Sequence, residues 1–255
     1  MTRITTVINQ KGGVGKTSTA HALATGLKHK GFSVLVVDTD PQGNLSYTMR
    51  ADTNTRGLYE AMREEATALD VIQKTPQCDI IPSTLLLTAA DMEFTSTGRE
   101  WLLDTLLKPI KNLYNYIVID SPPTLGILTI NALTACTDVI IPMGADIYSL
   151  QGLNQLYSTI GKVRKFCNRE ITIAGLLLTR YSSRTILARD IRDGIEAKAE
   201  ELNATIYKTV IRESVSVKEA QTSQQSLFDY SPASNPAQDY MDFIREYLTQ
   251  AKGGK

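Results

Sequence analysis

Short apolar runs alternate along this chain with longer segments in which apolar residues recur at helical spacing. Each run is apolar almost throughout, rather than at every second position, which is typical of strands buried on both faces. Alternation of such strands with helices predicts an α/β fold, in which helices flank both sides of a mainly parallel, doubly wound sheet. The predicted strands cover residues 4–8, 33–38, 78–82, 116–120, 138–142 and 171–179.

The segments between these runs differ in how clearly they predict helices. In the first, Leu23 and Leu27 share one face, and Gly31 follows as a residue suited to end a helix. The segment 205–211 predicts a further short strand, whereas residues 51–98 show several short helical pieces around one strand. The predicted helices cover residues 17–30, 149–166, 184–202 and 236–248.

Composition and charge narrow the class of protein. We find no internal repeat and no low-complexity linker, so we predict one domain over residues 1–255, with a frayed tail at 251–255. Lys plus Arg and Asp plus Glu both number 27, so nucleic acid could bind only through a local patch. The chain has no C-x-x-C pair, no signal-peptide pattern and no apolar run long enough for a membrane span. We therefore predict a cytoplasmic protein with no membrane partner.

A glycine-rich segment, KGGVGKT at residues 11–17, lies between the first predicted strand and the first predicted helix. Glycines adopt backbone conformations that other residues resist, so loop N–H groups can close around phosphate oxygens at a helix N-terminus. A standard phosphate loop reads G-x-x-x-x-G-K-[ST], and Gln10 stands where its first glycine would be. We still predict a phosphate loop, in which Lys16 reaches the β- and γ-phosphates and Thr17 ligates Mg²⁺.

Three aspartates follow apolar strands at the edge of the sheet where the phosphate loop is expected. Asp38 and Asp120 each end a predicted strand, and Asp40 lies in the turn just beyond Asp38. Mg²⁺ at a nucleotide prefers one or two carboxylates, so Asp38 and Asp120 are predicted to hold the hydrated metal. Asp40 is predicted to orient the attacking water. Any one aspartate could equally be a helix cap or a turn former, so the prediction depends on all three together.

Several motifs resemble the deviant-Walker ATPases of the ParA/MinD family. The motifs with the most specific resemblance are KGGVGKT (11–17), VVDTDPQGN (36–44) and YIVIDSPP (116–123). DPQGN points within the family to the ParA, or Soj, type. Further ParA-like segments extend the resemblance over most of the chain: RYSSRT (180–185), IRESVSVKEA (211–220) and FDYSPASNPAQDY (228–240).

The resemblance implies a Mg²⁺-dependent ATPase that partitions plasmids or chromosomes. Members form a homodimer around two ATP molecules, in which Lys11 contacts the nucleotide of the other subunit and Gly12 tolerates close approach. Lys11, Lys16 and Asp40 are therefore the expected catalytic residues. The ATP-bound dimer binds DNA without sequence preference, which associates it with the nucleoid, and a ParB-like centromere-binding protein stimulates hydrolysis. The predicted ATP-binding residues are Lys11, Gly12, Gly13, Val14, Gly15, Lys16, Thr17 and Ser18.

The segment 211–220 departs from the family pattern. Chromosomal members read I-P-R-N-V-R-L-S-E-A there, and Glu213 and Ser216 replace the two arginines of that pattern. The DNA-binding surface therefore stays open, although phosphate contacts would make binding strongly salt-dependent. The positive residues that could form it are Arg180, Arg184, Arg189, Arg212 and Lys218. The resemblance also places the nucleobase near Thr179, Ile211, Arg212 and Glu213.

Two other functions stay open. A MinD-like ATPase that cycles on membranes would need a basic amphipathic C-terminal helix, whereas residues 235–255 are mainly acidic before the last few and resemble a docking helix. A metabolic enzyme, such as a biotin-synthesis or cobyrinate-type amidation enzyme, would carry substrate-recognition motifs that we do not find. Because the phosphate loop begins at residue 11, we also expect no helix-turn-helix domain before it.

Overall fold

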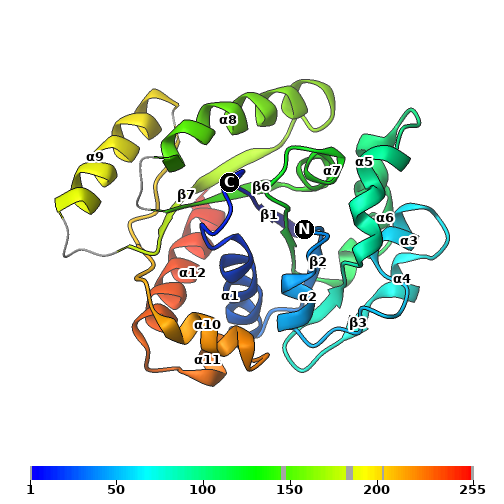
Figure 1. The fold of residues 1–255 in the computed structure, drawn as a ribbon, viewed down its shortest axis with the longest axis horizontal. Coiled ribbons are helices and arrows are strands. Elements are labelled where there is room, and N and C mark those ends of the chain that lie inside the picture. The colour runs from blue at the N-terminus through cyan, green and yellow to red at the C-terminus, as the bar shows by residue number, and fades with distance from the viewer. Residues whose placement is uncertain (1, 145–147, 182–185, 203, 254–255) are drawn as a thin grey trace.

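A seven-stranded sheet forms the centre of the protein (Figure 1). The computed structural model describes residues 2–144, 148–181, 186–202 and 204–253. All neighbouring strands are parallel except β3 and β4, which are antiparallel at one edge. In their order across the sheet, the strands are β3 (Gln73–Lys74), β4 (Asp79–Ile81), β2 (Val34–Asp38), β5 (Tyr116–Asp120), β1 (Arg3–Val7), β6 (Asp138–Gly144) and β7 (Thr172–Thr179).

Helices cover both faces of this sheet, which confirms the predicted doubly wound α/β fold. One layer contains α1 (Lys16–His29), α2 (Asn44–Thr48), α10 (Val215–Thr222), α11 (Leu227–Tyr230) and α12 (Asn235–Gly253). The other contains α3 (Leu58–Met62), α4 (Ala68–Val71), α5 (Ala90–Glu93), α6 (Leu102–Leu107), α7 (Ile127–Ala135), α8 (Tyr148–Phe166) and α9 (Ile186–Glu201). Short 3₁₀ turns cover Leu85–Ala89, Arg99–Trp101 and Lys111–Leu113.

Alternate residues of each central strand belong to different cores. In β2, Leu35 and Val37 pack under α3–α9, while Val34 and Val36 pack under α1 and α12. Side chains alternate between the two faces of a strand, so a strand covered on both sides must be apolar at every position. By this alternation, Asp38 lies on the same face of the sheet as Val34 and Val36, which is the face of α1, and it is the last residue of β2.

Helix α12 packs against α1 at the outside of the sheet (Figure 1). Its residues Phe243, Ile244 and Tyr247 are fully buried, and a Cβ at Gly26 of α1 would overlap Ile244. A side chain at position 26 would therefore force Ile244 to shift, and the apolar face of α12 is used for docking. Gly31 has a φ of +87° and follows the end of α1, as predicted.

The predicted strand at 205–211 is wrong. The segment follows β7 through isolated bridges, with Ile206 opposite Leu176. The backbone N–H groups of Lys208 and Thr209 instead donate to the Glu246 carboxylate, at 2.7 and 3.1 Å. These bonds to α12 draw two consecutive amides away from β7 and interrupt the ladder.

Candidate nucleotide-binding site

The glycine-rich loop connects β1 to α1, at the carboxyl edge of the sheet. Gly13 and Gly15 have φ values of +73° and +80°, a left-handed conformation in which a side chain is strained. Gly15 is also the N-cap of α1, so the loop runs directly into a helix N-terminus. Protein sites for phosphate groups often combine glycines in such conformations with the partial positive charge of a helix N-terminus.

Side chains within the loop hold its backbone in place. Asn9 donates to the Pro142 carbonyl at 2.7 Å and accepts from the Lys11 N–H at 3.0 Å. Lys16 Nζ in turn donates to the Lys11 carbonyl at 3.0 Å. Burial lowers the pKa of Lys16, against the opposing effect of the nearby Asp120 and Asp40 carboxylates. The ammonium therefore lies between the loop and the acidic strand ends.

Asp38 and Asp120 meet at the ends of neighbouring strands, where they are register partners in the pairing of β2 with β5. Both are fully buried. Asp38 accepts hydrogen bonds from the Ser46 N–H and hydroxyl, at 2.8 and 2.7 Å. Burial raises the pKa of Asp38 to about 6, and burial together with the nearby Asp38 raises the pKa of Asp120 well above its usual range. Lys16 is the cation near this pair, and its charge opposes the rise in the pKa of Asp120.

The arrangement fits a divalent cation at these two aspartates. Neither side-chain oxygen of the buried Asp120 has a hydrogen-bond partner, and an unpaired buried carboxylate is costly. The Thr17 hydroxyl lies close enough to lower the pKa of Asp120. The site thus offers two carboxylates and one hydroxyl, and no group of three or more His, Cys, Asp or Glu able to hold a metal occurs among the described residues. Few protein ligands suit Mg²⁺, which keeps waters and takes oxygens from nucleotide phosphates.

Asp40 lies at the mouth of the site in a tight turn. Its side chain accepts from the Gln42 N–H at 3.0 Å, and its carbonyl accepts from the Gly43 N–H and from the Ser83 hydroxyl, at 2.9 and 2.6 Å. Asp40 is 8% exposed and lines the pocket described next. The turn therefore presents one carboxylate to the pocket while its backbone is tied to the segment after β4.

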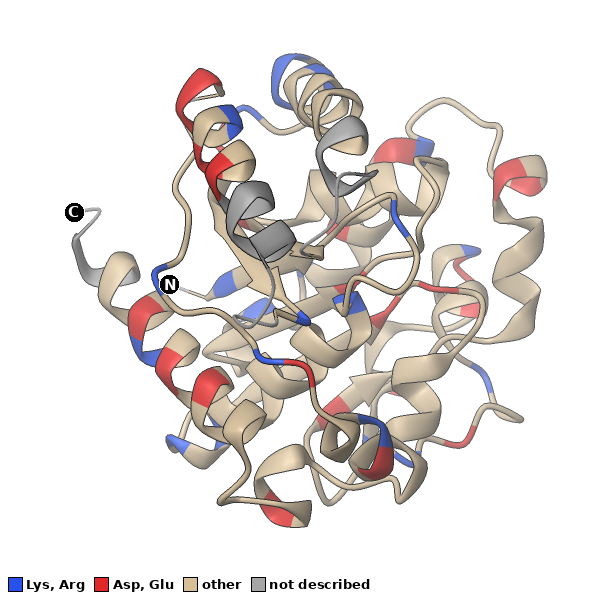
Figure 2. Ribbon diagram, turned by 60° about the vertical axis from the view of Figure 1, so that its left-hand side comes forward, with Lys and Arg blue, Asp and Glu red and all other residues tan. Residues whose placement is uncertain are grey.

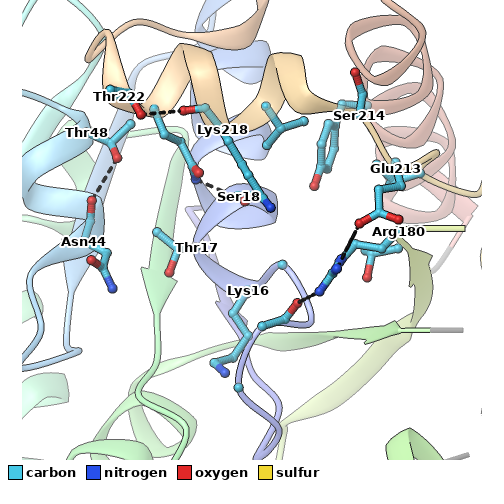
Figure 3. Close-up of a pocket in the computed structure, with 18 of the residues that line it drawn as sticks. Lys16, Thr17, Ser18, Asn44, Thr48, Arg180, Glu213, Ser214, Lys218 and Thr222 are labelled. Atoms are coloured by element: carbon cyan, nitrogen blue, oxygen red, sulfur yellow. Dashed lines mark hydrogen bonds and ion pairs between the residues drawn. The ribbon is translucent and has the colours of Figure 1, made fainter. Parts of the chain in front are cut away.

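A pocket of about 670 Å³ opens above the loop (Figure 3). Its walls come from the loop and α1, from α2, from the end of β7 with the segment 211–214, and from α10. Lys11, Val14, Asp38 and Asp120 do not line it. The residues predicted to bind phosphate, base or DNA, or to act in catalysis, that do line it are Gly12, Gly13, Gly15, Lys16, Thr17, Ser18, Asp40, Thr179, Arg180, Ile211, Arg212, Glu213 and Lys218.

The residues predicted near the nucleobase share this pocket but differ in their contacts. Thr179 is buried, and its hydroxyl donates to the Val14 and Met143 carbonyls at 2.8 and 3.2 Å. Arg212 turns toward α12, where its Nε and Nη2 donate to Asp239 at 2.9 and 2.6 Å. The Thr179 hydroxyl and the Arg212 guanidinium are thus both used in contacts within the chain.

The positive residues predicted to bind DNA are not equally available. Arg180 pairs with Glu213 and Arg212 with Asp239, so a carboxylate balances each charge. Lys218 points from α10 into the pocket (Figure 3). Arg184 lies outside the described residues, as does the side chain of Arg189 in α9.

Several residues of the site carry no signal in the sequence. The Ser46 hydroxyl donates to Asp38 and also accepts from the Ser83 N–H at 2.9 Å. Ser46 therefore links the end of β2 to the segment that follows β4. Gln221 of α10 donates to the Ser18 hydroxyl at 3.1 Å. These contacts join segments far apart in the sequence, so no local motif could predict them.

The fold and the site define a P-loop nucleotide-binding protein, and comparison with known proteins narrows the class. A family model described as an AAA domain matches residues 2–173. The sporulation initiation inhibitor protein Soj of Bacillus subtilis (strain 168) is 39% identical over 252 residues, which cover 96% of this chain and 98% of that protein. The chromosome partitioning protein ParA of Caulobacter vibrioides (strain NA1000 / CB15N) is 35% identical over 257 residues, covering 98% and 95%. The chain belongs to the ParA/Soj type of the ParA/MinD family of partitioning ATPases, which confirms the resemblance.

A solved structure with another activity is also similar. Cobyrinic acid a,c-diamide synthase from Mycobacterium smegmatis, with a bound ATP analog and magnesium, superposes with a TM-score of 0.88 at 28% identity. The match covers 100% of this chain and 98% of that one. The shared fold therefore does not by itself identify the reaction of this chain.

Proposed function

We propose that this protein is a Mg²⁺-dependent partitioning ATPase. In the ATP state it forms a homodimer and binds DNA without sequence preference, and a ParB-like protein stimulates its hydrolysis. The observation that carries the proposal is the position of Lys16 and Asp40 in one pocket at a helix N-terminus, with the buried Asp120 carboxylate, whose oxygens have no hydrogen-bond partner, near Lys16. The relatives named for chromosome partitioning support the biological role.

The residues of the loop are proposed to bind the phosphates of ATP. The N–H groups from Gly12 to Ser18 and the Lys16 ammonium would receive the phosphate oxygens. Thr17, Asp38 and Asp120 would hold Mg²⁺, which when bound offsets the negative charge of the phosphates. The base would occupy the end of the pocket that Ile211 and Glu213 line.

The test of this function compares the nucleotide states of the whole chain. With Mg²⁺ and ATP, light scattering is expected to give about twice the monomer mass of 28.1 kDa, and ADP is expected to leave the monomer. The ATP form should retard DNA of arbitrary sequence at low salt and release it steeply as salt rises, because phosphate contacts release counterions. ATP binding without DNA retention in any nucleotide state would contradict the DNA part of the proposal.

Asp40→Ala is predicted to keep ATP binding and the dimer while it slows hydrolysis. Loss of a group that positions or activates water typically costs about 10²- to 10⁴-fold in rate. Phosphate release under single-turnover conditions measures the rate, and light scattering follows the persistence of the dimer.

Two further variants separate chemistry from structure. Asp40→Asn retains an acceptor for the Gln42 N–H and should still be slow, whereas Asp242→Ala, at an exposed site on α12, should hydrolyse normally. Hydrolysis at the wild-type rate by Asp40→Ala would show that Asp40 has no catalytic role.

The two other functions are less well supported. A MinD-like membrane anchor would need a helix with a spare apolar face, but that of α12 is buried on α1, and acidic residues recur along it (Figure 2). No helix in the described chain combines the length and the apolar character needed to cross a bilayer. Flotation with lipid vesicles in the absence of DNA binding would favour the MinD-like function. An ATPase rate that does not respond to DNA would favour an amidation enzyme of the cobyrinate type.

A further inference from the structure

The end of β7 holds two successive carbonyl groups of the phosphate loop. The Thr179 hydroxyl donates to the Val14 carbonyl at 2.8 Å, and Arg180 Nη1 donates to the Gly13 carbonyl at 3.1 Å. Figure 3 shows Arg180 between the loop and Glu213. The last residue of β7 and the residue after it thus bind neighbouring residues of the loop, at a separation of more than a hundred residues in the sequence.

Arg180 is itself fixed by its surroundings. Its Nε and Nη2 both donate to Glu213 Oε1, at 3.2 and 2.9 Å. Its φ of +53° lies in the left-handed region, which a non-glycine residue adopts at a cost and keeps only where neighbouring contacts hold it. The Tyr181 N–H donates to the Ile211 carbonyl at 3.0 Å and the Glu213 N–H donates to the Tyr181 carbonyl at 3.4 Å, which keeps the segment that carries Glu213 beside the end of β7. These contacts hold the Arg180 guanidinium in an orientation that faces the loop.

These contacts orient the N–H groups of the loop. In a trans peptide the carbonyl of one residue and the N–H of the next point in opposite directions. The bonds at Gly13 and Val14 therefore direct the N–H groups of Val14 and Gly15 away from β7. Donors fixed before the ligand arrives do not have to be ordered on binding, which favours affinity.

We propose that Thr179 and Arg180 are positioning residues that preorganise the phosphate loop, with Glu213 as the anchor of Arg180. The inference rests on the proposed ATP-binding function. It gives Thr179 and Arg180 a different role from the base contact and the DNA contact expected of them. It also gives a reason for an acidic residue at position 213, where the chromosomal pattern has arginine.

Thr179→Val and Arg180→Met test the proposal by isothermal titration with ATP and with ADP. Thr179→Val removes one hydroxyl donor, and Arg180→Met removes the guanidinium with its bonds to Gly13 and Glu213. Each variant is expected to weaken the binding of both nucleotides by roughly tenfold. Thr179→Ser keeps the hydroxyl and is expected to bind like the wild type. The matched controls are Thr172→Val, at the other end of β7, and Arg164→Met, whose Nε donates to the Ile171 carbonyl remote from the pocket.

The melting temperature without nucleotide separates positioning from folding. A positioning role predicts little change in that temperature but a smaller upward shift on addition of ATP. Glu213→Gln removes the charge that anchors Arg180, and it does so at a half-exposed side chain, so folding should not be affected. A few-fold loss of nucleotide affinity is expected. This variant therefore tests the inference even if Thr179→Val folds poorly.

Wild-type affinity in Thr179→Val, Arg180→Met and Glu213→Gln would overturn the inference and leave the proposed function intact. Failure of the wild type to bind ATP would overturn both.

Discussion

Lys16→Ala is expected to abolish detectable ATP binding. The lysine is the buried cation between the loop and the aspartates, and its charge opposes the rise in the pKa of Asp120. Its loss removes a charge-assisted bond to phosphate, worth about 3 kcal/mol or roughly a hundredfold in affinity. It also removes the cation near Asp120, so the pKa of that carboxyl should rise further. Titration calorimetry with ATP in the presence of Mg²⁺ measures the effect.

Lys28→Ala is the matched control, because Lys28 lies in the same helix and its ammonium donates to the Pro76 carbonyl at the exposed surface. This variant should bind ATP like the wild type. Retention of near-normal affinity by Lys16→Ala would mean that the loop does not bind phosphate through this lysine, and would remove the main support for the proposed function.

The central strands were predictable because burial on both faces leaves a continuous apolar run. Where elements are short, that signal disappears. Besides β4, residues 51–98 form α3, α4, α5, a two-residue edge strand and a 3₁₀ turn, which are too brief to show a period. The segment 205–211 has the composition of a strand, but Glu246 of α12 takes two of its amides. A competing partner from a distant helix cannot be seen in a local pattern.

In the site, too, local motifs could be predicted but contacts between distant segments could not. The loop and the three aspartates are contiguous motifs at strand ends, so their placement at one edge of the sheet could be predicted from the sequence. The contacts that govern how those residues act come from elsewhere. Arg212 is a cation in the sequence, yet Asp239 binds it through two nitrogens and its backbone N–H. The sequence shows Arg180 and Arg212 as positive charges but does not show that Glu213 and Asp239 balance them, because each carboxylate lies in another segment of the chain.

Lys11→Ala is expected to keep ATP binding by the monomer but to lose the ATP-dependent dimer or its hydrolysis. Lys11 opens the loop, and its backbone already serves the structure by accepting from Lys16 Nζ and donating to Asn9. Alanine retains both backbone contacts, so the loop should keep its shape. A cation supplied in trans can contribute about 10³-fold or more to phosphoryl transfer, because it stabilises charge only in the assembled site. Light scattering and single-turnover hydrolysis measure the two effects.

The resulting pattern distinguishes a trans cation from a second phosphate-binding lysine of the same subunit. If Lys11 served its own nucleotide, Lys11→Ala would weaken ATP binding by the monomer, as Lys16→Ala does. If it serves the other subunit, mixing Lys11→Ala with the hydrolysis-defective Asp40→Ala should give mixed dimers in which one site pairs an intact Asp40 with a lysine from the partner. Lys30→Ala, at the exposed end of α1, controls for loss of positive charge. Normal dimers and normal hydrolysis in Lys11→Ala would rule out the trans role.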